Sequence, residues 1–188
     1  MPVHTVVLTV GLKITDNEAR SALEALRVKM GLGEQVRALA REDRWELDVE
    51  TETAAEAEAA VARLVQTTNV FANPNKHRYA FAPAGASHGA DLAPDEVAVL
   101  VTDREGAQGE SMVVALRRAG AASVVAVRRS ARWRVRLATP PAPGQPGLLE
   151  LVRRIGVAES RSEGLLANPH SQTVRAVFPW GEQKPLVD

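Results

Sequence analysis

The sequence predicts an α+β fold in which one small domain of order βαββαβ occurs twice in tandem. Three observations lead to this prediction. Short segments of the two halves match in the same order, strand and helix patterns follow one another alike in both halves, and a stretch rich in Ala, Gly and Pro separates them. We therefore expect a first repeat at residues 1–82, a linker at 83–94, a second repeat at 95–180 and a tail at 181–188.

The matching segments keep their order along the two halves. Trp45 and Trp133 each lie nine residues after a valine, Val36 in the first half and Val124 in the second. Small changes in the offset between partners require only insertions or deletions in loops. The other matches are Ala25-Leu26-Arg27 with Ala115-Leu116-Arg117, Phe71-Ala72-Asn73-Pro74 with Leu166-Ala167-Asn168-Pro169, and the strand ends Phe81 and Phe178.

Each element of the first repeat has a local pattern of its own. Apolar residues alternate along the strands and recur at helical spacing along the helices. Thr15-Asp16-Asn17-Glu18 and Thr53-Ala54-Ala55-Glu56 have the form of capping boxes, and Gly31 is typical of a helix end. These patterns predict, in order, a strand at 5–12, a helix between Thr15 and Gly31, strands at 35–41 and 44–50, a helix opening at Thr53, and a strand at 77–81.

The second repeat shows the same order of patterns. They predict a strand at 97–102, a helix at about 108–119, strands at 123–128 and 132–137, a shorter helix near 148–155 and a last strand at 173–178. A βαββαβ order predicts an antiparallel sheet with both helices on one face, which is the ferredoxin-like arrangement. Because the other face of each sheet would stay uncovered, we expect the two copies to pack together as a pseudo-twofold pair.

The composition excludes several classes of protein. Without cysteine, the chain has no disulfides, no thiol catalysis and no zinc–thiolate site. Its start lacks the pattern of a secretion signal, and no apolar run approaches the roughly 20 residues that a membrane span needs. We therefore expect a cytoplasmic protein that does not enter a membrane.

Motifs that carry chemistry are missing from the sequence. The four histidines do not have the spacing of metal ligands, and no nucleophile elbow, Walker loop or dinucleotide fingerprint is present. Asp48 and Glu50 lie on one strand face, which we interpret as a solvated face rather than a magnesium site. The sequence therefore predicts no catalytic residue and no cofactor or metal bound by this chain.

Three arginines form a basic stripe on one predicted strand. Arg132, Arg134 and Arg136 share the face opposite Trp133 and Val135. We favour a solvated face, or one that answers the acidic face of the first copy, over a protein-binding surface. Nucleic acid is the weakest alternative, because no aromatic residues interleave with these arginines.

Asn73-Pro74 and Asn168-Pro169 are the repeated features that packing explains least well. Proline keeps the preceding Asn in an extended conformation, and the Asn amide can bond a nearby backbone group. We therefore interpret both dipeptides as structural turns.

A series of short motifs runs through the first half of the chain. They are Val10-Gly11-Leu12-Lys13 leading into Asp16, a helix with Ala22-Leu23 and Leu26, then Val36-Arg37, the strand from Trp45 to Val49, and Phe71-Ala72-Asn73-Pro74. In the order of these motifs over residues 4–81, the first half resembles PurS, the small subunit of phosphoribosylformylglycinamidine synthase. The second half, 95–178, keeps the late Asn-Pro segment but has Thr102-Asp103 in place of Leu12-Lys13.

The resemblance implies a non-catalytic subunit that dimerises and joins the glutaminase and synthetase subunits of one complex. That complex converts formylglycinamide ribonucleotide to the amidine with glutamine and ATP in purine biosynthesis, and ATP and magnesium are expected on the synthetase partner. A tandem chain would then be a covalent dimer. The candidate structural or partner-contact residues are Lys13, Asn73, Pro74, Asn168, Pro169, Arg132, Arg134 and Arg136.

The sequence departs from the family near two of these places. Lys76-His77-Arg78 and His170-Ser171-Gln172 follow the Asn-Pro segments, where family members usually have acidic residues. Thr15 to Glu18 replaces a turn that contains glycine. A pair of domains that binds a small regulatory molecule is the alternative function, and self-association of the chain stays open.

Overall fold

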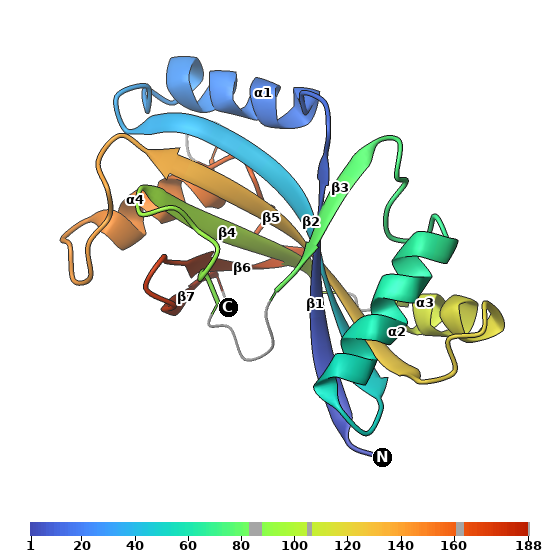
Figure 1. Ribbon diagram of the computed structural model, residues 1–188. Helices are drawn as coiled ribbons and strands as arrows, with labels where there is room; N and C mark the ends of the chain where they lie inside the picture. The colour runs from blue at the N-terminus through green and yellow to red at the C-terminus, as the bar shows by residue number, and fades with distance from the viewer. Residues whose placement is uncertain (83–87, 105–106, 161–163, 188) are drawn as a thin grey trace. The chain divides into compact units, whose positions relative to one another are not determined.

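The computed structural model describes residues 1–82, 88–104, 107–160 and 164–187 (Figure 1). Residues 83–87 of the predicted linker lie outside this set. The elements in order are β1 (Val3–Leu12), α1 (Asn17–Glu24), a π-helical turn (Ala25–Lys29), β2 (Val36–Glu50), α2 (Ala54–Thr67), β3 (His77–Phe81), β4 (Glu96–Asp103), α3 (Ala107–Arg118), β5 (Val124–Leu137), α4 (Leu148–Gly156), β6 (Gln172–Val177) and β7 (Gln183–Val187).

The strands belong to a single seven-stranded sheet in the order β3-β1-β2-β5-β4-β6-β7. Two tandem ferredoxin-like units would each have a sheet of their own, with a hairpin in the middle of each repeat. The predicted pair of βαββαβ units, packed as a pseudo-twofold pair, is therefore wrong.

The error arises at the two predicted hairpins. Segments 35–41 and 44–50 were expected as separate strands, but β2 runs through both without a break, and β5 does the same in the second half. Neither junction, Glu42-Asp43 or Arg129-Ser130-Ala131, contains a glycine, the residue that tight hairpin turns favour most. A strand of 15 residues is roughly 50 Å long, too long to lie within one small domain.

The chain divides into two compact units, and both long strands contribute to each. Unit 1 contains the described residues within Met1–Ile14, Asp43–Gly85 and Glu105–Ser130. Unit 2 contains those within Thr15–Glu42, Ala86–Arg104 and Ala131–Asp188. As a result α1 and α4 belong to unit 2, and α2 and α3 belong to unit 1.

In unit 1, β1 pairs with β3 in antiparallel register, with Leu8 opposite Phe81 and Leu12 opposite His77. Helix α2 packs on β1, and the core lies between the helices and this part of the sheet. Helix α3 adds Leu116, which is fully buried. The largest buried contributors from the remaining elements are Leu8, Trp45, Leu47, Val61 and Phe71.

In unit 2, β4 lies between β5 and β6 and is antiparallel to both. Helix α1 contributes Ala19 and Ala22 to the core of this unit, and Leu26 follows in the π-helical turn. The core residues from the second half of the chain include Val97, Val99, Trp133, Val135, Val152 and Ile155.

The N-terminal caps of α1 and α2 can be compared with the caps that the sequence predicts. At α2 both bonds of the Thr53–Glu56 capping box are present, which confirms that prediction. At α1 the cap is Asp16 rather than Thr15, because the Asp16 carboxylate accepts from the backbone N–H groups of Glu18 and Ala19.

The segment that was expected to be a tail is a strand of the sheet. Residues 183–187 form β7, which pairs with β6.

Among the described residues no helix is long and apolar enough to cross a bilayer.

Candidate functional site

The first Asn-Pro segment forms a tight turn in unit 1. The Asn73 side-chain oxygen accepts from the backbone N–H of Asn75 at 2.9 Å. The Asn73 carbonyl accepts from the N–H groups of Lys76 and His77, and the Asn73 N–H donates to Nδ1 of His77 at 2.9 Å. The turn is therefore held closed by four hydrogen bonds around one asparagine, as an Asx turn is.

The second Asn-Pro segment repeats this geometry in unit 2. The Asn168 side-chain oxygen accepts from His170 N–H at 2.9 Å, and the Asn168 carbonyl accepts from the N–H groups of Ser171 and Gln172. The Asn168 N–H donates to the Gln172 side-chain oxygen at 2.9 Å, in the place that His77 takes in the first turn. The interpretation of both dipeptides as turns agrees with these bonds.

A cation at the end of the neighbouring strand fastens each turn. Lys13 donates from Nζ to the Pro74 carbonyl at 2.6 Å, and its backbone N–H donates to the Lys76 carbonyl. In unit 2 the Arg104 guanidinium lies 3.4 Å from the Pro169 carbonyl, and the Arg104 backbone N–H donates to Ser171.

Arg104, which the sequence comparison missed, is thus the counterpart of Lys13. Leu12 lies opposite His77 as Asp103 lies opposite Gln172, so Leu12 corresponds to Asp103. The signal was present in the sequence as a cation directly after the strand. It was overlooked because the apolar residue that precedes Lys13 is replaced by an aspartate.

The two turns differ in the charge of the residues that follow them. Lys76 and Arg78 in unit 1 correspond to Ser171 and Thr173 in unit 2. The first turn is therefore strongly basic, and the second carries neutral side chains at the same positions.

The predicted basic stripe lies in unit 2, where acidic partners neutralise it. Arg132, only 4% exposed, binds both carboxylate oxygens of Asp91 at 2.6 and 2.8 Å and approaches Glu42 at 3.4 Å. This is the bidentate geometry that the arginine guanidinium favours with a carboxylate. Arg132 is therefore part of the structural framework of this unit.

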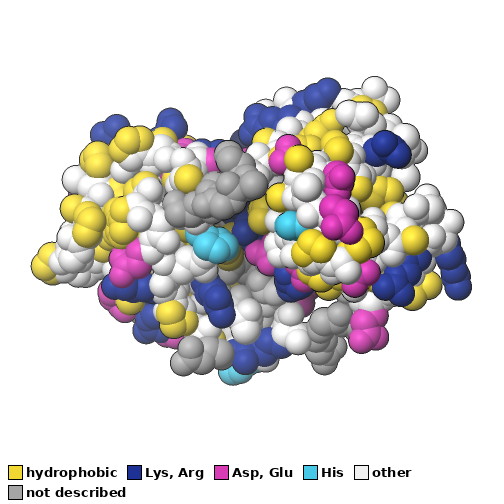
Figure 2. Space-filling view, turned by 60° about the horizontal axis from the view of Figure 1, so that its bottom comes forward, with side chains coloured by type: hydrophobic (Ala, Val, Ile, Leu, Met, Phe, Trp, Pro, Cys, Tyr) yellow, Lys and Arg dark blue, Asp and Glu magenta, His cyan; other side chains and the backbone are white. Residues whose placement is uncertain are grey.

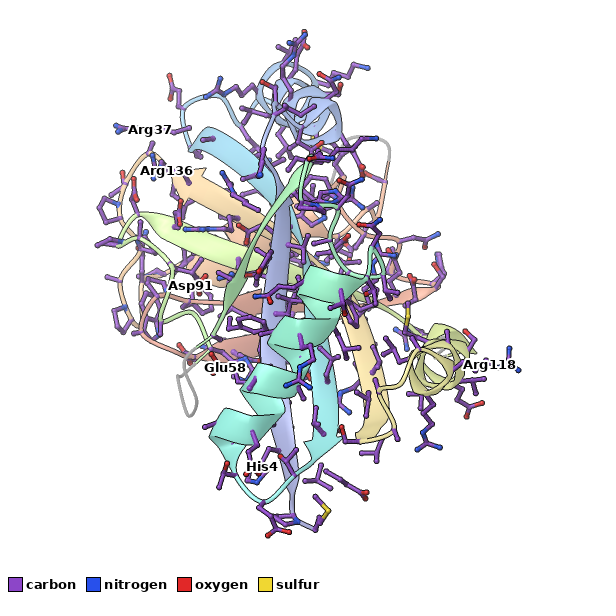
Figure 3. All side chains as sticks on the ribbon, turned by 45° about the vertical axis from the view of Figure 1, so that its right-hand side comes forward. His4, Arg37, Glu58, Asp91, Arg118 and Arg136 are labelled. Atoms are coloured by element: carbon purple, nitrogen blue, oxygen red, sulfur yellow. The ribbon has the colours of Figure 1, made fainter. Side chains whose placement is uncertain are left out.

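The other two arginines of the stripe meet at Glu96. Arg134 donates to the Glu96 carboxylate from Nε at 3.2 Å, and Arg136 lies 3.4 Å from Glu96 and from Asp95. Burial raises the pKa of Glu96, but the hydrogen bonds from Arg134 and from the backbone of Ala93 outweigh it, so this pKa lies below its ordinary value. Asp91 and Arg136 are labelled in Figure 3.

The acidic face of β2 has a different arginine as its partner. In unit 1, Arg128 binds Asp48 at 2.8 and 3.0 Å and Glu46 at 3.2 Å, while Thr5 donates to Asp48 at 2.7 Å. The hydrogen bonds from Arg128 hold the pKa of Asp48 below its usual range. On the face shown in Figure 2, basic and acidic side chains are both widely spread.

Each of the two matching tryptophans is covered by an arginine from the opposite half of the chain. The guanidinium of Arg129 lies 5.2 Å from the ring centre of Trp45 in unit 1. The guanidinium of Arg41 lies 5.7 Å from that of Trp133 in unit 2. Both distances are within the range of a cation–π interaction.

No family model and no curated protein matches this chain. The resemblance to PurS therefore stays a prediction made from the residues. Within the described ranges, no group of three or more His, Asp or Glu side chains is placed to hold a metal ion. The prediction that any ATP and magnesium lie on a partner is likewise untested.

Proposed function

We propose that this chain is a non-catalytic bridging subunit of the PurS kind. In this function it joins a glutaminase to a synthetase that converts formylglycinamide ribonucleotide to the amidine with glutamine and ATP. The observation that supports the proposal most is the pair of fastened Asn-Pro turns. They contain the late Asn-Pro segment, which is one of the motifs behind the resemblance, and one turn occurs in each compact unit.

The turns have the properties that a contact surface needs. Pro74 and Asn168 are largely exposed, so a partner can reach both segments. The backbone of each turn is already held by internal hydrogen bonds, so little conformational entropy is lost when a partner binds. A rigid, exposed turn is therefore suited to position another protein.

A bridging subunit has to bind two different partners. The two turns share the same backbone geometry but present different side chains to a partner. The basic side chains Lys76 and Arg78 follow the first turn, whereas Ser171 and Thr173 occupy the same positions after the second. Because charge decides which partner surface fits, the two turns suit two partners of different chemistry.

Reconstitution with purified subunits tests this proposal. We expect the chain alone to have no turnover, and to restore glutamine-dependent turnover when it is added to the synthetase and the glutaminase. Turnover with ammonia in place of glutamine should need only the synthetase, because no transfer between subunits is then required.

Variants of the turns show whether these segments are responsible. Replacing Asn73 or Asn168 with alanine should reduce glutamine-dependent turnover and leave ammonia-dependent turnover unchanged. Glu150, an exposed residue of α4, serves as the control through a Glu150→Gln variant. Glutamine-dependent turnover that is the same with and without the chain would refute the proposal.

A further inference from the structure

One edge of β3 has no neighbouring strand among the described residues, since β3 stands first in the sheet order (Figure 1). The N–H of Lys13 bonds the Lys76 carbonyl, and the N–H of Ala82 bonds Val7. Because bonding alternates along an antiparallel pair, Arg78 and Ala80 point their backbone groups toward β1. The backbone groups of the intervening residues, Tyr79 and Phe81, therefore point to the free edge.

Three cations surround the start of this free edge. Lys13 follows the last residue of β1 and its backbone N–H bonds Lys76, the residue before β3, while Arg78 lies in β3 two residues after Lys76. Like charges that lie near one another repel. Within the described part of the chain neither Lys76 nor Arg78 forms an ion pair, so this repulsion is not relieved internally.

Aromatic side chains line the opposite face of the same strand. Tyr79 is 40% exposed, and its ring meets Phe81 edge to face, with 6.0 Å between the ring centres. An added strand would cover apolar surface here in addition to forming backbone hydrogen bonds.

Unit 2 shows how the corresponding edge is filled. There β7 pairs with the outer edge of β6 in antiparallel register, with Val177 opposite Gln183 and Ala176 opposite Lys184. By the bonding pattern of the turns, β6 is the counterpart of β3. The chain thus supplies its own strand to one of two equivalent edges and, in the described residues, none to the other.

We propose that the free edge of β3 receives an extended, acidic segment of a partner protein as an additional antiparallel strand. The backbone of Tyr79 and Phe81 would bond the segment, while Lys76 and Arg78 would bind its carboxylates. Only the identity of the partner rests on the proposed function. Charges on an edge also discourage pairing between identical chains, which agrees with a partner of opposite charge rather than a second copy.

A synthetic peptide of alternating Glu and Val residues is a suitable probe, and fluorescence anisotropy measures its binding to the full chain. The double variant Lys76→Glu/Arg78→Glu should bind at least about tenfold more weakly. The matched control is Ser171→Glu/Thr173→Glu, which places the same charges after the second turn and should bind as the unchanged chain does. A peptide with Lys in place of Glu should not bind.

Hydrogen exchange on the unchanged chain provides a readout that does not depend on variants. The peptide should slow exchange at the amides of Tyr79 and Phe81, whereas those of Arg78 and Ala80 are protected by β1 beforehand. Absence of peptide binding, or equal binding by both double variants, overturns the proposal. Protection of Tyr79 and Phe81 that rises with protein concentration alone also overturns it, because a second copy would then occupy the edge.

The same variants separate this inference from the bridging function. If the peptide binds as expected but neither synthase subunit binds the chain, only the bridging function fails. If the peptide does not bind but the synthase subunits assemble with Lys76→Glu/Arg78→Glu as tightly as with the unchanged chain, the edge proposal fails and the bridging function stands.

Discussion

Arg132 holds Asp91 through two hydrogen bonds of 2.6 and 2.8 Å, one to each carboxylate oxygen. Arg132 is buried in the middle of β5, whereas the Asp91 side chain, on the segment before β4, is 57% exposed. The pair therefore anchors the chain at its entry into β4. Leu92, the next residue, packs with Ala98 and Val177 beneath this segment.

The Asp91→Asn variant should lower the free energy of unfolding by about 1–3 kcal/mol, because the buried Arg132 loses its charged partner. Glu42, at 3.4 Å, keeps the loss below that of a wholly unpaired charge. Chemical denaturation measures the change. As the matched control, Asp95→Asn should cost about 0.5 kcal/mol or less, because Asp95 pairs at 3.4 Å with the half-exposed Arg136. Equal effects of the two variants would show that the Arg132 pair has no special role.

Stability should fall on acidification because arginine partners lower the pKa values of four carboxylates. In the folded chain the pKa values of Asp48, Asp91, Glu46 and Glu96 all lie below their ordinary values, because the hydrogen bonds from arginine outweigh the effect of burial. A lowered pKa stabilises the fold above the pKa of the unfolded chain, and this contribution is lost as pH falls through the folded value.

The free energy of unfolding should therefore be nearly constant above about pH 5 and decrease steadily from there toward pH 3. Urea denaturation at a series of pH values gives this curve. The Asp48→Asn variant should have a shallower decrease, since one titrating pair is removed. A free energy of unfolding that is unchanged between pH 6 and pH 3 would contradict the assigned pairs.

Gly89 should not tolerate a side chain. Its φ is +84°, and a Cβ atom there would lie 2.3 Å from the backbone oxygen of Phe178. We expect Gly89→Ala to cost about 2–3 kcal/mol, from the combined backbone strain and collision. Gly144 has a similar φ of +72° but open space around it, so Gly144→Ala should cost only about 1 kcal/mol. Thermal unfolding of the two variants compares them, and a Gly89→Ala cost no larger than that of Gly144→Ala would argue against this packing.

Local patterns in the sequence predicted local structure well. The alternating residues of β1, the capping box at Thr53 and the two Asn-Pro turns all depend on neighbours in the chain. Short-range hydrogen bonds and side-chain periodicity decide such features, so one segment contains the information required.

The pairing of distant segments could not be predicted in the same way. Whether residues 36–50 fold back as a hairpin or continue as one strand depends on what packs against each half of the strand. Arg132 offers a second example, because nothing near it in sequence indicates that Asp91, 41 residues away, neutralises it. The stripe of arginines was visible in the sequence, but its partners were decided by the tertiary fold.

Separating the two halves of the chain tests most directly whether they share both compact units. Leu26 of the first half lies in the core of unit 2, and Leu116 of the second half lies in the core of unit 1. Residues 1–82 and 88–188, produced as separate polypeptides, should each fail to form a folded monomer, and should recover cooperative unfolding as a one-to-one complex when mixed. Either fragment folding alone as a stable monomer would contradict the shared units.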